Sequence, residues 1–516
     1  MKTTPLALVG AVAATGLLMS APVSAGKKDD TLNVVLPRDV QTLDNMYSTR
    51  RESHIVTKMI DDMLFYLDPV SGNPVPNLAK SHKFTNDSTL DIELHRGIKF
   101  HDGSELKAED VAYSLNFQRS KKSKAKRRKR FAFWLKNVEV MGPYTVRLNM
   151  VRPYTLALYD LANYSRIRKK GTYDDPKAPD GVNTAAQQMA VNGLGPYKVV
   201  SFQPRKKLIL ERFEGYRKDG PKGIPAIKRV TVRTVPDFGT QAAELMAGSA
   251  DWAYNVPTDV AMDVAASGRA RHIAGPSMRV AFLVLDASGS AEPNGPLTKL
   301  KVRQAMNHAI DKTSIVNNLV KGKAQVIHAA CNPVQFACTQ DVKTYAYDPA
   351  KAKKLLADAG YPNGFPLVLW AYRERPVGEA IINQLKQIGI DVSLRYVKGS
   401  TLAKARKKDE VVAYHATTGS GSIAHTGAIV PSYFGPRTIH KYAQHDKKLS
   451  DLVVKATSSY DEEVQKSNFR LALKRIADQA YWVPIYKYSL NYLASNELDF
   501  DPPSDGMPRL FLAKWK

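Results

Sequence analysis

Short apolar, β-branched segments alternate with segments of helical periodicity along most of this chain. Residues 31–36 are the first such apolar segment and have the composition of a strand. Residues 301–311 show the helical pattern, with apolar side chains at i, i+3, i+4, i+7 and i+8 on one face. These side chains are Val302, Ala305, Met306, Ala309 and Ile310. Strands that alternate with helices predict an α/β protein.

Further segments continue this alternation. The other expected strands are residues 89–94, 144–150, 197–201, 208–212, 227–235, 280–285, 367–370 and 391–396. The expected helices are residues 108–119, 239–247, 301–307 onward, 349–359, 377–388 and 461–479. Asp348 and Pro349 are suited to begin the helix at 349–359, as N-cap and first-turn proline, and Gly360 is suited to end it.

The first 25 residues have the features of an export signal. Lys2 precedes an apolar run at 6–19, and the small residues at 23–25 offer a cleavage site. The run is shorter than the ~20 apolar residues that span a bilayer. No Cys follows it, which argues against a lipid anchor. We therefore expect a periplasmic protein, at residues 26–516, whose signal peptide at 1–25 is cleaved.

Cys331 and Cys338 are the only cysteines of the chain. In an oxidising compartment, such a close pair favours a disulfide. Closing this short loop would restrict the unfolded chain by about 2–3 kcal/mol in the entropic account. The alternative, a two-thiolate metal site, lacks further ligands at a suitable spacing. We expect the disulfide.

The formal net charge is +26, and part of it lies in the basic block at residues 121–130. The aromatic residues at 131–134 follow at once, and a basic and aromatic order can indicate nucleic acid or lipid headgroups. A solvated helix or loop is the simpler interpretation. No nucleic-acid-binding motif accompanies the block, so we expect no nucleic-acid partner. The alternative function is an exported basic protein that binds anionic envelope polymers or nucleic acid through this block.

Motifs of secreted hydrolases are absent from the sequence. There is no Gly-x-Ser-x-Gly elbow, no His-Glu-x-x-His pair and no phosphate-binding loop. A disulfide would leave no free cysteine as a nucleophile. We therefore expect no catalytic residue and no enzyme.

Histidines are the remaining metal-binding candidates. His415, His425, His440 and His445 occur late in the chain, and neutral imidazole is a common ligand of zinc, copper and nickel. Their spacing specifies no coordination geometry. We expect loop or core histidines, with neither a metal nor a cofactor.

Several longer phrases occur in a characteristic order. They are Phe-His-Asp-Gly-Ser at 100–104, Ala-Glu-Asp-Val at 108–111, Gly-Leu-Gly-Pro-Tyr at 193–197, Val-Pro-Asp at 235–237, Ala-Gly-Ser-Ala-Asp at 247–251, the helical phrase at 301–311, Tyr-Asp-Pro-Ala-Lys-Ala at 347–352, Ala-Gly-Tyr-Pro-Asn-Gly-Phe at 359–365 and Gln-Leu-Lys-Gln-Ile-Gly-Ile at 384–390. Together they resemble the extracytoplasmic solute-binding proteins of peptide-type ABC importers, the family-5 or cluster C group.

This resemblance implies an α/β periplasmic-binding-protein fold of two lobes with a hinged cleft between them. Lobe I is expected at 26–275, with an extra subdomain at about 45–185; lobe II is expected at 276–483, and the chain should return to lobe I at 484–516. The implied function is a receptor, expected to be a monomer, that closes over a peptide-like or small polar solute. It would present that solute to an ABC permease and, through it, to ATPase subunits. Opines, sugar-acid conjugates, oligosaccharides and metal chelates stay open as cargo.

One segment departs from the pattern of the family. Peptide binders typically carry an acidic residue in this region, matched to the N-terminal ammonium of a peptide, but residues 411–440 include no Asp or Glu. Imidazole and hydroxyl groups there could bind neutral polar parts of a solute instead. The candidates are His415, Thr418, Ser420 and Ser422. The alternative is that the acid comes from elsewhere in the chain.

Two basic segments are further candidates for contact with the solute. Tyr372 and Arg373 follow an expected strand, a position that commonly faces a crevice in α/β lobes. The guanidinium could hold a carboxylate or phosphate while the ring packs against apolar parts of the ligand; alternatively, Glu374 pairs with a neighbouring arginine. Tyr47 and Arg50 lie in a comparable loop. Both segments would suit an anionic solute.

Overall fold

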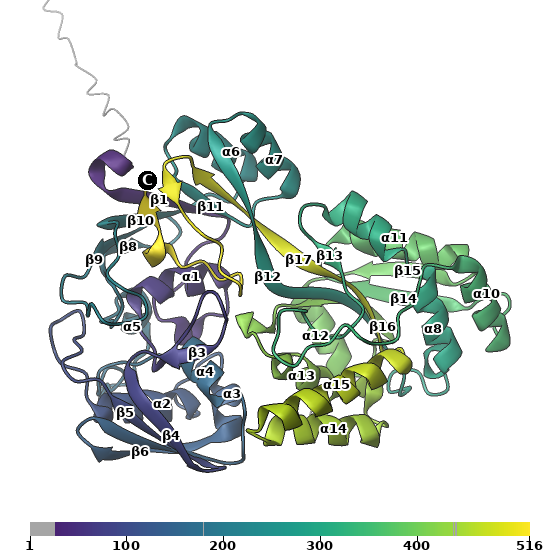
Figure 1. Cartoon of the computed structure of the whole chain (residues 1–516), viewed down its shortest axis with the longest axis horizontal. Coiled ribbons are helices and arrows are strands. Elements are labelled where there is room, and N and C mark those ends of the chain that lie inside the picture. The colour runs from purple at the N-terminus through teal and green to yellow at the C-terminus, as the bar shows by residue number, and fades with distance from the viewer. Residues whose placement is uncertain (1–25, 179, 437, 439–440) are drawn as a thin grey trace, which may run out of the picture.

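The computed structural model describes residues 26–178, 180–436, 438 and 441–516, and it shows two lobes joined by a pair of long strands (Figure 1). The expected signal peptide and His440 lie outside the described residues, as does the side chain of Ser420. We call the part that contains β1, β8–β11 and a separate four-stranded sheet lobe I. The part that contains β14–β16 and α8–α15 is lobe II. The mixed α/β architecture confirms the predicted fold class.

One large mixed sheet passes through both lobes. Its strand order is β15-β14-β16-β12-β17-β11-β1-β10-β9-β8, with β13 paired to β17. These strands are β1 (Thr31–Leu36), β8 (Tyr197–Gln203), β9 (Lys207–Arg212), β10 (Arg229–Thr234), β11 (Trp252–Tyr254), β12 (Ala270–Leu285), β13 (Gln325–Val326), β14 (Pro366–Ala371), β15 (Asp391–Tyr396), β16 (Ala413–Thr418) and β17 (Trp482–Ser495). In lobe I, β1 runs parallel to β10 and β11, which is typical of an α/β sheet.

The two connecting strands, β12 and β17, run antiparallel along the centre of the sheet. The expected lobe boundaries, 275/276 and 483/484, fall inside these strands, so the residue at which each lobe begins stays a prediction. The ladder shifts register where Pro276 pairs with Ser489 and Val280 with Lys487, because β12 holds more residues between these pairs than β17 does. Such an irregularity bends a strand and re-aims its side chains. Here it brings Ser277 and Arg279 to the space between the lobes.

The separate sheet of lobe I is antiparallel, in the order β4-β5-β7-β6. Its strands are β4 (Ala79–Asn86), β5 (Thr89–Leu94), β6 (Leu135–Gly142) and β7 (Thr145–Met150). Alternate side chains of β5 and β7, such as Ile92 and Val146, are buried beneath helices, as the period of two in a strand requires. Ile423 of lobe II also belongs to this core, which therefore extends across the lobe boundary.

Helices cover both faces of the large sheet and one face of the small one (Figure 1). Those of lobe I and the hinge are α1 (Arg51–Ile60), α2 (Ala108–Arg119), α3 (Arg128–Trp134), α4 (Ala157–Asn163), α5 (Ala185–Met189), α6 (Phe238–Ala247) and α7 (Thr258–Ala266). Those of lobe II are α8 (Leu300–Ala309), α9 (Lys312–Ser314), α10 (Pro349–Asp358), α11 (Arg375–Gln387), α12 (Gly399–Lys407), α13 (Val430–Phe434), α14 (Lys447–Ser458) and α15 (Glu462–Asp478).

Short elements complete the fold. The two small strand pairs are β2 (Phe65–Leu67) with β3 (Pro74–Pro76), and β18 (Leu498–Asp499) with β19 (Lys514–Trp515). The short 3-10 or π turns are η1 (Lys27–Asp29), η2 (Asn45–Tyr47), η3 (Pro296–Thr298), η4 (Ile315–Val320), η5 (Ser420–Ser422), η6 (Thr426–Ala428), η7 (Lys441–Ala443) and η8 (Leu510–Leu512). Each helix of the described residues is too short or too polar to cross a bilayer.

Three local predictions are confirmed in lobe II. The apolar stripe of α8 is buried against the sheet, with Val302 and Met306 fully enclosed. The Asp348 carboxylate caps α10 by accepting a hydrogen bond from the Lys351 amide at 2.9 Å. A disulfide joins Cys331 and Cys338, whose Cα atoms lie 5.8 Å apart.

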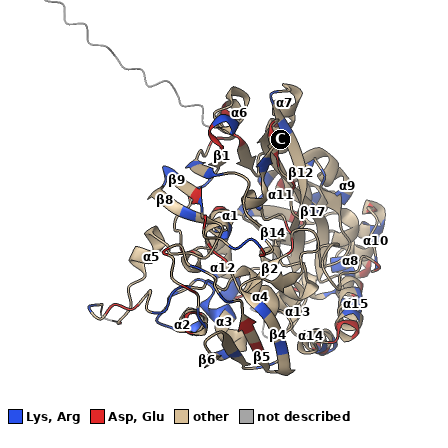
Figure 2. Ribbon diagram, turned by 60° about the vertical axis from the view of Figure 1, so that its left-hand side comes forward, with Lys and Arg blue, Asp and Glu red and all other residues tan. Residues whose placement is uncertain are grey.

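The basic block at 121–130 is only partly solvated. Its lysines are exposed, and Lys and Arg gather around α2 and α3, although they are also spread over the rest of the molecule (Figure 2). Arg127 instead lies over the Tyr164 ring, 3.9 Å from its centre. Arg130 Nη2 lies 2.6 Å from the buried carboxylate of Asp160. Arg127 and Arg130, at the end of the block, therefore help to hold the subdomain together.

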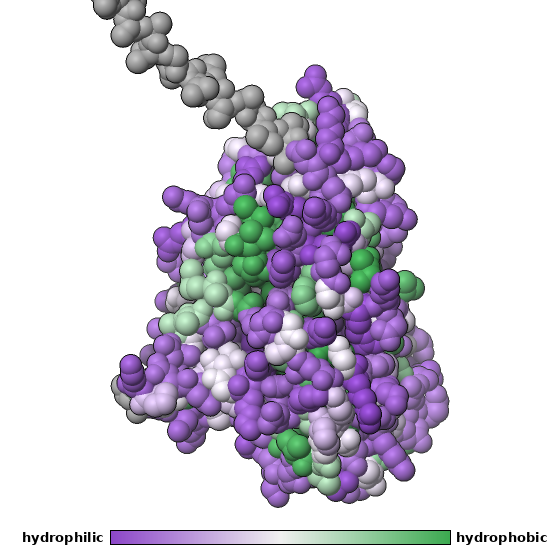
Figure 3. All heavy atoms as spheres, turned by 90° about the vertical axis from the view of Figure 1, so that its left-hand side faces the viewer, coloured by the Kyte–Doolittle hydropathy of each residue, from purple (hydrophilic) through white to green (hydrophobic). Residues whose placement is uncertain are grey.

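The face of lobe I in Figure 3 is mostly hydrophilic, with apolar side chains in separate patches.

Candidate ligand-binding site

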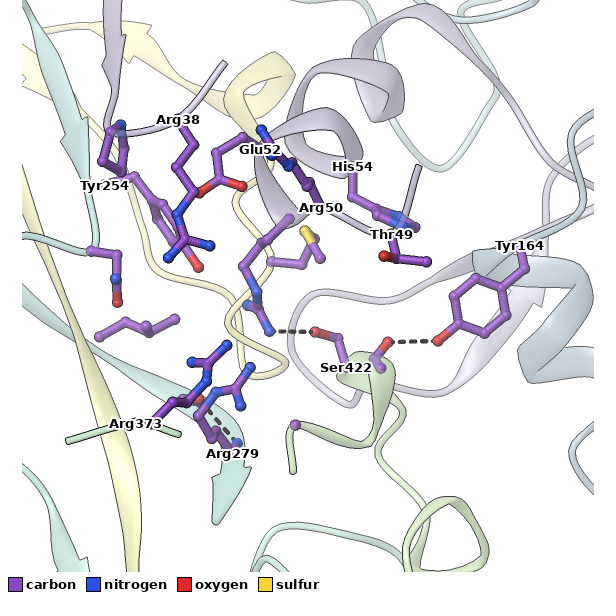
Figure 4. A pocket seen from close by; sticks show the side chains of 18 of the residues that line it. Arg38, Thr49, Arg50, Glu52, His54, Tyr164, Tyr254, Arg279, Arg373 and Ser422 are labelled. Carbon is purple, nitrogen blue, oxygen red and sulfur yellow. Dashed lines mark hydrogen bonds between the residues drawn. The ribbon is translucent and has the colours of Figure 1, made fainter. Parts of the chain in front are cut away.

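A cavity of about 560 Å³ lies between the lobes (Figure 4). Its walls come from segments far apart in the sequence: the loops around β1 and α1, the irregular part of β12, the end of β14 and the loop after β16. Cavities of this volume commonly hold small-molecule ligands. The position between the lobes means that a bound solute would contact both of them.

The wall from lobe I is built around the start of α1. Ser48 Oγ accepts a hydrogen bond from the Arg50 amide at 3.1 Å, which turns the chain into the helix. Thr49 and Arg50 precede the helix, and Arg51 is its first residue. Because the first turn of α1 points between the lobes, several polar side chains of one short segment line the cavity together.

Arg50 and Arg51 make different contacts. Arg50 Nη1 lies 2.5 Å from Asp39 Oδ1, so this charge is already paired within lobe I. Arg51 donates from Nη1 to the Gly506 carbonyl at 2.6 Å and from Nη2 to the Ser422 hydroxyl at 3.3 Å. Burial acts to lower the pKa of Arg51, but Tyr254, Tyr492 and the Asp505 carboxylate act in the opposite direction, and the pKa is raised. Arg51 therefore stays charged while it links the lobes.

His54 adds no charge to this wall. Its side chain is buried one turn after Arg51, and it lines the cavity. Burial lowers the pKa of His54 well below its ordinary value, and the positive charges of Arg166 and Arg127 lower it further. The imidazole is consequently neutral at pH 7.

The opposite wall carries two arginines side by side. The guanidinium groups of Arg279 and Arg373 lie close together and face the cavity in Figure 4. Arg279 Nη1 donates to Thr417 Oγ1 at 2.8 Å. Burial lowers the pKa of Arg279, and the charges of Arg373 and Arg51 lower it further. Like charges in partly desolvated surroundings repel, so this pair is suited to an anion placed between the two groups.

The loop at 419–422 of lobe II makes direct contacts with lobe I. The Gly421 carbonyl accepts hydrogen bonds from Asn163 Nδ2 at 2.6 Å and from the Tyr164 hydroxyl at 3.2 Å. Gly421 has a φ of +65°, and a Cβ atom there would lie 1.9 Å from the Tyr164 hydroxyl. Only glycine suits both the conformation and the close approach.

The charge of the cavity lining is strongly one-sided. Among the described residues that line it, six are arginines and one, Glu52, is acidic. The arginines are Arg38, Arg50, Arg51, Arg127, Arg279 and Arg373. Glu374 does not offset them, because it faces Tyr486, whose hydroxyl donates to Glu374 Oε2 at 3.4 Å. Arg375 pairs with Glu379 instead, at 2.8 Å. A low-dielectric site of this charge favours an anionic ligand.

The structure brings together some of the residues singled out from the sequence. Arg50, Arg373 and Ser422 line the cavity. Tyr47 packs beside the Met46, Ala125 and Tyr173 cluster in lobe I, away from the cavity. Tyr372 lines a separate pocket of about 220 Å³ with Tyr414 and Tyr433.

The remaining candidates lie on or beside β16. His415 is buried within the strand and Thr418 ends it. Ser420 begins η5, and its side chain lies outside the described part of the structure. Their role in binding stays a prediction, since neither His415 nor Thr418 lines the cavity between the lobes.

Several cavity residues were not singled out from the sequence. Glu52, Arg51 and Arg127 stand within or beside segments that were noted as basic, so a weak signal was present. Arg279 had none, because its position depends on the irregular pairing of β12 with β17. Of the other histidine candidates that the structure describes, His425 Nε2 lies 3.0 Å from Gln465 Oε1, and His445 Nε2 lies 3.5 Å from the Tyr481 hydroxyl oxygen. In the described ranges, no group of three or more His, Cys, Asp or Glu residues is placed to hold a metal ion.

Comparison with known proteins identifies the family. Residues 73–438 match the family described as bacterial extracellular solute-binding proteins, family 5 Middle, and the chain belongs to this family. The glutathione-binding protein GsiB of Pectobacterium atrosepticum is 25% identical over 491 residues, which cover 92% of this chain and 91% of that protein.

Solved structures share the fold. The ABC transporter substrate-binding protein CtaP of Listeria monocytogenes superimposes with a TM-score of 0.81 at 20% identity, covering 94% of this chain and 99% of CtaP. NikA of Brucella suis, in complex with Fe(III)-EDTA, gives a TM-score of 0.80 at 22% identity and covers 94% of this chain and 100% of its own. The predicted family resemblance and two-lobed fold are thus confirmed, and the chain is a solute receptor by family.

Proposed function

We propose that this chain is the periplasmic receptor of an ABC importer for a small anionic, peptide-like solute. The observation that carries the proposal is the cavity between the lobes, lined by six arginines and one acidic residue. A solute with one or more carboxylates would replace the repulsion between neighbouring guanidinium groups with charge-assisted hydrogen bonds. A cationic peptide would add to the repulsion, and a neutral one would offset less of the positive charge.

Binding would act through closure of the lobes. Arg51 contacts Ser422, and Tyr164 contacts Gly421, so the described arrangement already has direct contacts between the lobes. A solute that touches both walls adds further contacts that exist only when the lobes are closed, which shifts the population toward the closed state. An importer permease would recognise that state and accept the solute, with ATPase subunits supplying the energy. No covalent chemistry is needed, so binding rather than catalysis is the function.

The relatives give a first test ligand. GsiB is named as a glutathione-binding protein, and glutathione is a tripeptide with two carboxylates. It is small enough for a cavity of about 560 Å³. We therefore take glutathione, together with tripeptides of similar size, as probes of the charge preference.

Isothermal titration calorimetry with tripeptides of equal length and differing charge tests the proposal. We expect anionic tripeptides to bind one per chain, and neutral and cationic ones to bind at least about tenfold more weakly, a difference of about 1.4 kcal/mol. Affinity for the anionic probe should fall only modestly with added salt, because partly buried charge pairs are screened much less than exposed ones. Preference for a cationic tripeptide would contradict the proposed anionic class.

A further inference from the structure

Glu52, the one acidic residue of the cavity, has no hydrogen-bond or ionic partner among the residues that the structure describes. Its side chain is only 6% exposed, and it lines the cavity from the first turn of α1. The Glu52 carboxylate therefore has no donor among the described residues, and it faces the cavity, where a donor group of a bound solute can reach it.

The other buried acids among the described residues each have a hydrogen-bond donor or an ionic partner. Asp61 pairs with Arg168 at 2.6 Å, and Asp505 with Arg509 at 2.8 Å. The remaining buried acids also have donors among the described residues, and these are Asp44, Asp62, Asp110, Asp160, Asp251, Asp286 and Asp446. Glu52 is the exception in the described part of the chain, and it is also the one that borders the cavity.

The surroundings of Glu52 fit a cationic group. Figure 4 shows Glu52 on the same wall as Arg38 and Tyr254. Tyr254 lines the same cavity, and burial raises the pKa of its hydroxyl; Arg51 acts to lower that pKa and the negative charge of Glu52 acts to raise it. An ammonium group placed here would donate to the carboxylate and lie against an aromatic ring that also lines the cavity.

We propose that Glu52 binds an amino group of the solute, so that the ligand is an amino acid derivative with more acidic than basic groups. This inference rests on the proposed function. The carboxylates of the solute would lie among the arginines, and its ammonium would complete the hydrogen bonding of Glu52. The acidic residue missing from 411–440 would thus be replaced by one from the opposite lobe.

Matched pairs of probes test this assignment on the whole mature chain. Each pair is an anionic glutamyl tripeptide with a free amino group and the same tripeptide acetylated on that nitrogen, titrated by calorimetry. We expect acetylation to weaken binding to the parent protein by at least about tenfold, the scale of one hydrogen bond to a charged group. In Glu52→Gln, the difference within a pair should shrink to less than about threefold. If Glu52 had only a structural role, Glu52→Gln would instead weaken the binding of both members of a pair equally.

The control is Glu109→Gln, which removes the same charge from the exposed surface of α2 and should leave the difference within each pair unchanged. Equal affinity of the parent for both members of every pair overturns the inference and leaves the proposed function intact. Binding of no member by the parent counts against the proposed function, and the inference falls with it. Should Glu52→Gln fail to fold, the effect of acetylation on binding to the parent protein still tests whether the amino group of the solute is bound.

Discussion

Arg51 of lobe I donates a hydrogen bond from Nη2 to the Ser422 hydroxyl of lobe II at 3.3 Å. Its Nη1 donates to the Gly506 carbonyl, which lies on the segment that follows β17. One guanidinium therefore connects a helix start, a loop of the other lobe and the C-terminal segment. Such a link makes the cavity lining depend on the relative position of the lobes, which is what a closing receptor needs.

Arg373 should be far more important for binding than its neighbour Arg375. Arg373 lines the cavity, whereas Arg375 pairs with Glu379 on the surface of α11. We expect Arg373→Ala to weaken binding of the anionic tripeptide by about 2–5 kcal/mol, because the anion of the solute loses its partner. Arg375→Ala should change affinity by less than about 0.5 kcal/mol. Calorimetry on both variants measures the contrast, and equal effects would show that Arg373 is a structural arginine.

Gly421→Ala should impair closure. The new Cβ would meet the Tyr164 hydroxyl and would force a side chain into the left-handed region at φ +65°. We expect affinity for the anionic tripeptide to fall at least about tenfold, the consequence of roughly 1–3 kcal/mol of strain. Small-angle scattering should show less compaction on adding ligand than in the parent.

Gly97→Ala is the matched control. Gly97 also has a positive φ, +74°, but a Cβ atom there would meet no atom within 4 Å, and it lies outside the cavity lining. Its scattering profile should match that of the parent at saturating ligand. Normal compaction of Gly421→Ala would show that the 419–422 loop does not govern closure.

Loss of the disulfide should destabilise lobe II. Cys331 and Cys338 close a short loop, and removing the cross-link gives the unfolded chain more freedom. The double variant with Cys331→Ser and Cys338→Ser should lose about 2–3 kcal/mol of unfolding free energy in urea. Non-reducing peptide mapping of the parent should recover the two residues linked. An unchanged urea midpoint in the double variant would mean that the bond adds little to stability.

His425 should make stability depend on pH below neutrality. Burial lowers the pKa of His425 to about 4, against an ordinary value near 6.5. Between these values the unfolded chain binds a proton that the folded chain does not, so stability is fully present above about pH 6.5 and falls as the pH decreases toward 4. One such group contributes up to about 1.4 kcal/mol per pH unit in this window.

Urea unfolding between pH 7 and pH 4.5 measures this slope. The His425→Gln variant keeps hydrogen-bonding capacity but has no titrating group there, so its slope should be smaller than that of the parent. Because burial also lowers the pKa of His54, some slope should remain. Identical slopes would show that His425 does not titrate over this range.

Local sequence patterns predicted much of the fold. The strand at 89–94 and the helix at 108–119 have the expected bounds. The hinge strands were harder: 280–285 was expected, whereas β12 begins at Ala270, and β17 was not predicted at all. Pro484 lies within β17, and a proline in the sequence argues against a central strand. The strand forms because it pairs with β11 and β12, which are far away in the sequence. Such pairing leaves no local signal.

The cavity lining could be anticipated only in part from the sequence, and whether these residues bind the solute stays a prediction. Arg373 follows a strand end, a position that can be inferred from local sequence, and it lines the cavity. Arg279 and Glu52 could not be inferred in this way. The position of Arg279 follows from a register shift between distant strands, and the unpaired state of Glu52 is visible only when its neighbours in space are known.

The most direct test of the account is to ask which molecule the protein selects. A small-molecule extract is separated by ion exchange into anionic, neutral and cationic fractions, and each is incubated with the purified mature chain. Native mass spectrometry then records the mass of any solute that stays bound. We predict one bound solute per chain from the anionic fraction, and much less of it in Arg373→Ala. A solute bound only from the cationic or neutral fraction would contradict the central claim.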